Sequence, residues 1–119
     1  MAKDKKQTEK KFPNFLGDDF LLITANLFLE EAGLANADNN TKGEFINKIM
    51  TDFLDKATAM ILNRTDEDKM EELIKVAGSN MTYLEREAVL EEIIPGFKED
   101  MATLMELFKR KIRLEVYTK

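Results

Sequence analysis

Residues 41–64 read TKGEFINKIMTDFLDKATAMILNR, and this stretch decides the fold class. Its apolar side chains recur every three or four residues, the spacing that places them on one face of an α-helix. Thr41 and Glu44 have the spacing of a capping box, in which a hydroxyl and a carboxylate satisfy free amides at a helix start. We therefore expect a long amphipathic helix from about Thr41 to 63–65. Its expected inward side chains are Phe45, Ile46, Ile49, Met50, Phe53, Leu54, Ala57, Met60 and Ile61.

Four further helices are expected around this one, at 18–32, 66–77, 82–94 and 97–116, because each range is bounded by residues that start or stop helices. These boundary residues are Asp18 or Asp19, Gly33, Thr65, a second capping box at Thr82–Glu85, and Pro95-Gly96. The expected inward residues are Met70, Leu73, Ile74 and Ala77; Tyr83, Leu84, Ala88, Val89, Leu90 and Ile93; and Phe97, Met101, Leu104, Met105, Phe108 and Ile112.

The chain as a whole is therefore expected to be all-α, a compact bundle of about five helices. No segment alternates apolar and polar residues as a strand does. The length of 119 residues suits one domain. We expect a flexible, disordered basic tail at 1–14 and a single helical domain at 15–119.

Composition argues against an enzyme. The chain has no histidine and no cysteine, which removes the usual general base, thiolate metal ligands and nucleophile–histidine pairs. The acidic run at 66–72 lies on a predicted helix, where its carboxylates spread around the axis, so no metal site and no cofactor are expected. No signal-peptide segment or run of about 20 apolar residues is present, so we expect a cytoplasmic protein without membrane contact.

Charge is distributed unevenly along the chain. Residues 1–11 hold five lysines and two acids (+3), residues 109–119 hold five bases and one acid (+4), and the part between holds twenty acids and eight bases (−12), for a net −5. Direct binding of nucleic acid is not expected, because the acidic body would repel phosphates. The layout favours a protein partner or a second copy, steered by charge.

Three apolar features leave alternatives open. The helix at 18–32 is apolar nearly all round, which indicates a central helix wrapped by the others or, less favoured, a helix with one face in a partner's groove. Leu107 and Leu114 form a second stripe on the last helix, either covered within the protein or available for binding. The segment 12–16 is either an aromatic staple folded onto the bundle, which we favour, or a docking motif.

Several pieces of the chain resemble a family of small, uncharacterised all-helical proteins of candidate-phylum bacteria. These pieces are Glu31–Leu34, the run from Phe45 to Arg64 leading into Asp66–Val76, and Leu90–Phe97 with the basic helix after it. The resemblance implies a helical fold and no known activity.

The function expected from these patterns is that of a non-enzymatic helical module that binds another protein or associates with itself as a homodimer. One alternative is an acidic inhibitor that mimics nucleic acid, of the kind phages encode. Another is an accessory subunit of a large RNA–protein assembly, held by its basic ends. The candidate partner-binding residues are Phe12, Phe15, Leu16, Leu107, Lys109, Arg110, Lys111, Arg113 and Leu114.

Overall fold

The structure is a computed structural model that describes residues 15–118, with side chains up to Glu115. Five α-helices follow one another, and a 3-10 turn, η1 (Glu67–Lys69), precedes the third. They are α2 (Asp18–Glu31), α3 (Asn39–Arg64), α4 (Met70–Ala77), α5 (Tyr83–Ile93) and α6 (Phe97–Thr118). No strand occurs within this range, so the predicted all-α fold is confirmed. The predicted tail at 1–14 lies outside the described residues.

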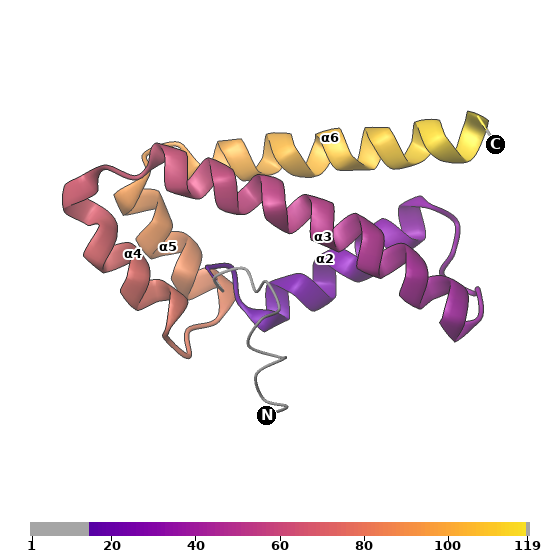
Figure 1. The fold of residues 1–119 in the computed structure, drawn as a ribbon, viewed down its shortest axis with the longest axis horizontal. Helices are drawn as coiled ribbons and strands as arrows, with labels where there is room; N and C mark the ends of the chain where they lie inside the picture. The colour runs from indigo at the N-terminus through magenta and orange to yellow at the C-terminus, as the bar shows by residue number, and fades with distance from the viewer. Residues whose placement is uncertain (1–14, 119) are drawn as a thin grey trace, which may run out of the picture.

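The three longest helices, α2, α3 and α6, contact one another, and the α4–α5 hairpin closes one end of the bundle (Figure 1). The bundle is flattened and measures 46 × 43 × 22 Å. A helix with its side chains is about 10–12 Å wide, so the short dimension holds only two helices. Consequently each long helix has one face in the core and another face turned outward.

Three phenylalanine rings form the centre of the core, one from each long helix. The centroid of Phe53 lies 5.5 Å from that of Phe28 and 5.2 Å from that of Phe108, both edge to face. Phe28 and Phe108 stack at 6.1 Å. Such pairs add about 0.5–1.5 kcal/mol each beyond the burial of their area. They align α2, α3 and α6 at one level of the bundle.

Phe15 and Leu16, just before α2, are core residues. Each is 4% exposed and belongs to the main hydrophobic cluster. This burial agrees with the favoured interpretation, a staple folded onto the bundle, and it removes Phe15 and Leu16 from the candidate partner-binding residues. The two side chains are stabilised there because their apolar surface is removed from water. Phe12, the remaining member of that predicted motif, lies outside the described residues.

The helix starts differ from prediction where two caps compete. Helix α3 begins at Asn39, because the carboxylate of Asp38 accepts a hydrogen bond from the Thr41 amide at 2.7 Å and caps the helix. Thr41 therefore lies inside the helix. The prediction of a capping box at Thr41 is wrong. Thr65 ends α3, donating its hydroxyl to Ile61 O at 2.6 Å, and does not cap the next helix. Helix α2 is preceded by Gly17, not capped by an aspartate.

Two other boundary predictions are confirmed. The capping box of Thr82 and Glu85 is present at the start of α5. Gly33, after α2, has the positive φ of 74° that the left-handed conformation requires. Both signals act within a few residues and face no competing residue, which is why they could be read from the sequence.

The inward faces of the short helices were partly mispredicted. Ile74 of α4 and Leu84 of α5 are 66% and 73% exposed, whereas Val76 and Arg86 are buried. In contrast, the main stripe of α6 is inward as predicted: its buried members are Phe97, Met101, Phe108 and Ile112. A short helix offers few apolar positions, so its neighbours decide which face is covered.

Candidate functional site

The outward face of α2 is an apolar stripe with an acid at each end. Its members recur every three or four residues and are all exposed; Leu22, Ile23 and Leu27 are 66%, 59% and 37% exposed. The opposite face, which includes Phe28, lies in the core. The favoured prediction of a helix wrapped by the others is therefore wrong. We call this set the α2 stripe: Asp19, Leu22, Ile23, Asn26, Leu27 and Glu30.

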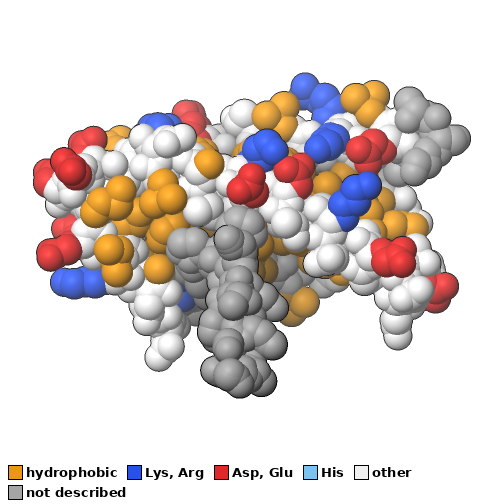
Figure 2. All heavy atoms as spheres, viewed as in Figure 1, with side chains coloured by type: hydrophobic (Ala, Val, Ile, Leu, Met, Phe, Trp, Pro, Cys, Tyr) orange, Lys and Arg blue, Asp and Glu red, His pale blue; other side chains and the backbone are white. Residues whose placement is uncertain are grey.

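The predicted second stripe of α6 is exposed as well. Leu107 and Leu114 are 51% and 60% exposed, and Arg110 lies between them on the same side of the helix. With Thr103 these three residues form the α6 stripe. Figure 2 shows hydrophobic and basic side chains alternating along α6. A shallow hollow of about 460 Å³ lies over this face, lined by Ala102, Thr103, Glu106, Leu107 and Arg110.

The predicted basic cluster divides into two parts. Lys111 Nζ lies 3.0 Å from Asp52 Oδ2 and 5.5 Å from the centroid of the Phe108 ring. Arg113 Nη1 lies 2.6 Å from Glu31 Oε2. These two cations hold α6 against α3 and α2. Lys109 and Arg110 form no ion pair with any residue that the structure describes, so they remain the better candidates for a partner's acids.

Asp52 is the acid at the centre of this contact. Its second oxygen accepts a hydrogen bond from Lys56 at 2.8 Å. The Lys56 and Lys111 ammonium groups together hold the pKa of the Asp52 carboxyl below its usual range. Asp52 is therefore charged in the folded protein at all but strongly acidic pH.

Arg86 is a buried cation that sequence reasoning missed. It is 3% exposed, and its guanidinium donates to Met81 O at 2.7 Å and to Val76 O and Ser79 O at 2.9 Å each. These carbonyls end α4 and shape the loop to α5. Charge-assisted bonds offset the cost of burying the guanidinium. Its neighbours in sequence, Glu85 and Glu87, suggested an ordinary exposed position, so no local signal could have identified it.

An open hollow of about 420 Å³ lies beside the start of α2. It is lined by Asp18, Asp19, Ser79, Asn80, Met81, Thr82 and Arg86. Several of its polar groups are already hydrogen-bonded: Asp19 accepts hydrogen bonds from the Phe20 and Tyr83 amides at 2.9 and 3.1 Å, and Ser79 Oγ donates to Val76 O at 2.8 Å. These contacts join α2 to α5. The hollow therefore resembles a structural junction more than a catalytic site.

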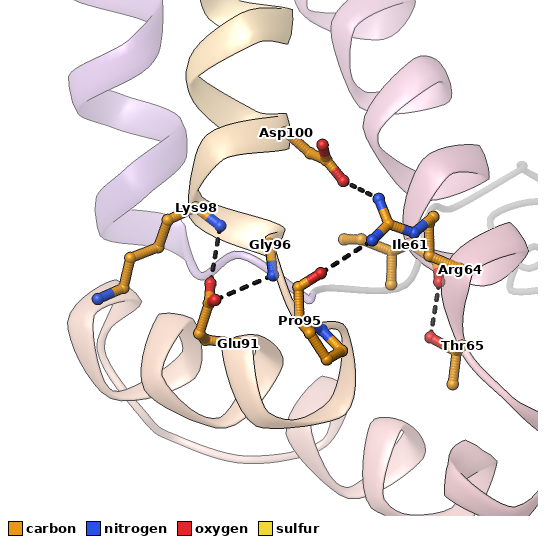
Figure 3. Close-up of polar contacts among 8 residues, drawn as sticks. All are labelled: Ile61, Arg64, Thr65, Glu91, Pro95, Gly96, Lys98 and Asp100. Carbon is orange, nitrogen blue, oxygen red and sulfur yellow. Dashed lines mark hydrogen bonds and ion pairs between the residues drawn. The ribbon is translucent and has the colours of Figure 1, made fainter.

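A second junction sets the start of α6 (Figure 3). Arg64, at the end of α3, pairs with Asp100 and donates to Pro95 O at 2.9 Å. Glu91 of α5 accepts the Gly96 and Lys98 amides at 3.0 and 2.9 Å, and these bonds lower the pKa of its carboxyl. The polar contacts in Figure 3 thus hold the long helix that carries the α6 stripe.

Neither a metal centre nor a membrane span is found among residues 15–118. No three acidic side chains there converge as metal ligands would, and no helix is both long and apolar enough to cross a bilayer. No protein-family model, curated protein or solved structure matches the chain. The resemblance to small helical bacterial proteins stays a prediction.

Proposed function

We propose that this chain is a non-enzymatic module that binds helical segments of other proteins or of a second copy. The supporting observation is the pair of exposed stripes on α2 and α6. Leucine side chains that stay 51–66% exposed at helical spacing are ready to pack against another helix. Each stripe lies on a long helix held by the aromatic core, so the binding surface is formed before the partner arrives.

The charges beside the α6 stripe extend this proposal. Lys109 and Arg110 neighbour Leu107 in sequence, and opposite charges on a partner would raise its association rate. An acidic amphipathic helix suits this surface. The basic end predicted to steer association is thereby reduced, within the described residues, to two side chains.

The proposal is tested by capture from a native lysate of the source organism. The full chain is immobilised beside a double variant, Leu107→Ser with Leu114→Ser, and a control, Leu84→Ser. Leu84 is 73% exposed and lies on α5, so it belongs to neither stripe. We expect a protein that binds the wild type and the control and is lost with the double variant. Absence of any specific partner, for a protein that is also monomeric, contradicts the proposal.

The two alternatives give different results in the same experiment. A mimic of nucleic acid would bind through carboxylates, so its partner would leave at moderate salt and remain with the double variant. An accessory subunit of an RNA–protein assembly would lose its partner when residues 1–11 are deleted. Binding through the stripes should persist at moderate salt and after deletion of residues 1–11.

A further inference from the structure

The charges of α2 are of one sign. Asp18–Glu31 contains four acids and no base, and two of these acids, Asp19 and Glu30, end the α2 stripe. Two α2 stripes from two copies therefore cannot pair favourably. Parallel packing places Asp19 of one copy against Asp19 of the other, and Glu30 against Glu30. Antiparallel packing places Asp19 of one copy against Glu30 of the other. Like charges at facing positions destabilise such a contact.

The α6 stripe is also unsuited to pairing with itself. Arg110 lies about midway between Leu107 and Leu114, so either direction of packing brings the Arg110 side chains of the two copies close together. Arg110 forms no ion pair with any other residue that the structure describes, so within that range its charge is available to a partner. Each stripe thus needs a partner of opposite charge.

The two stripes match each other in spacing as well as in charge. Leu107 precedes Arg110 by three residues, and Leu27 precedes Glu30 by the same interval. If Arg110 meets Glu30 in a parallel pair of helices, Leu107 packs on Leu27. In an antiparallel pair the mirror-image spacing from Asp19 to Leu22 serves equally, because Arg110 then meets Asp19 and Leu107 packs on Leu22.

We infer that the α2 stripe of one copy packs against the α6 stripe of a second copy, with Leu107 as the apolar anchor and Arg110 paired to Glu30 or Asp19. This inference rests on the proposed function and names the occupant of its two surfaces. If α2 of each copy packs on α6 of the other across a twofold axis, the complex closes as a dimer. If only one such contact forms between two copies, further copies join head to tail in a chain. We expect one helix pair to bury less than the ~800 Å² per partner of a standard interface, and therefore expect the complex to dissociate on dilution.

The first experiment is sedimentation equilibrium from micromolar to millimolar protein, with charge variants. Arg110→Glu places like charges across the contact in either direction, Glu30→Arg does so in a parallel pair, and Asp19→Arg does so in an antiparallel pair. We expect Arg110→Glu, and whichever acidic-site variant matches the direction of packing, to weaken self-association about tenfold. When Arg110→Glu is mixed with the matching acidic-site variant, both α2–α6 contacts between the two different copies join opposite charges, so the mixture associates more tightly than either variant alone. The inference is overturned if Arg110→Glu associates with neither acidic-site variant on mixing, or if the wild type is monomeric throughout.

Cysteine cross-linking then locates the contact. The chain has no cysteine of its own, so single substitutions report one position each. Leu107→Cys is mixed under mild oxidant with Leu27→Cys, with Leu22→Cys, or with the control Leu84→Cys. Disulfides require Cα atoms within about 7 Å, so we expect a fast mixed disulfide with Leu27→Cys or Leu22→Cys, whichever direction is correct. Equal rates for all three mixtures overturn the inference.

These outcomes separate the inference from the proposed function. If the wild type is monomeric yet captures a lysate protein that the Leu107→Ser, Leu114→Ser variant loses, the second-copy inference is wrong and the protein-binding proposal stands. If the charge-swapped mixture associates and cross-links, both are supported.

Discussion

Lys111 Nζ lies 3.0 Å from Asp52 Oδ2, and this ion pair joins α6 to α3 across 59 residues of sequence. Lys56 approaches the same carboxylate from one turn further along α3. Lys111, which was predicted to contact a partner, therefore helps to hold two helices of the bundle together. The surface left for binding is correspondingly smaller and more apolar than the sequence suggested.

The Asp52 contact predicts a specific pH dependence. Its pKa is lower in the folded than in the unfolded chain, so its stabilisation is complete at neutral pH and is lost as pH falls through the folded-state pKa. Because the three side chains are partly solvated, we expect Asp52→Asn to lower the free energy of unfolding by only about 0.5 kcal/mol at pH 7, and by nothing at an acidic pH at which Asp52 is protonated. Urea unfolding at both pH values measures this, with exposed Asp55→Asn as control. If Asp52→Asn lowers the free energy of unfolding equally at both pH values, the pH dependence does not come from Asp52.

Thr24 offers a test of an unsatisfied polar group. Thr24 is 1% exposed, and its buried hydroxyl has no hydrogen-bond partner among the described residues. Thr24→Val removes that hydroxyl at nearly constant shape, and we expect stability to rise by about 1 kcal/mol. The matched control is Thr65→Val, which removes a buried hydroxyl bonded to Ile61 O and should lower stability by about 1 kcal/mol. Thermal unfolding of both variants decides; the same sign for both would be incompatible with this account.

Arg86 is expected to be the most sensitive charged residue. Arg86→Met leaves the carbonyls of Val76, Ser79 and Met81 without their donor, and we expect a loss of about 3 kcal/mol. Arg86→Lys should recover little of this loss, since an ammonium cannot reproduce the planar fork. Chemical denaturation measures the loss, and amide exchange in the loop at 78–82 shows where it arises. Lys75→Met, at an exposed cation of α4, serves as control and should be nearly neutral.

Two glycines should respond to alanine with opposite signs. Gly17 has φ 94°, and a Cβ there would lie 2.8 Å from Asp19 Oδ1 and 3.1 Å from Arg86 Nε. Gly17→Ala should therefore cost about 1–3 kcal/mol. Gly43 lies inside α3 with nothing within 4 Å of its added Cβ, so Gly43→Ala should gain about 0.5–1 kcal/mol through helix propensity. Thermal melts measure both effects. Melting temperatures that shift in the same direction in the two variants would contradict the backbone geometry described at these glycines.

The long helices could be predicted from sequence because many turns repeat the same pattern. The inward face of α3 rests on nine apolar positions, and that of α6 on six, so a single misplaced residue changes nothing. The short helices lack this redundancy. Helix α4 has 8 residues, and its covered face, with Val76 in and Ile74 out, depends on where α5 and the core lie.

The sequence by itself determined the all-α class, the long helices, the capping box at Thr82 and the left-handed turn at Gly33, because each depends on interactions within a few residues. Only the tertiary structure decided that Phe15 and Leu16 are buried, that Arg86 is enclosed by backbone carbonyls, and that Lys111 and Arg113 pair with Asp52 and Glu31. Those outcomes depend on which distant groups come together when apolar surface leaves water. The exposure of the α2 stripe has the same origin: a bundle two helices thick cannot cover both faces of α2.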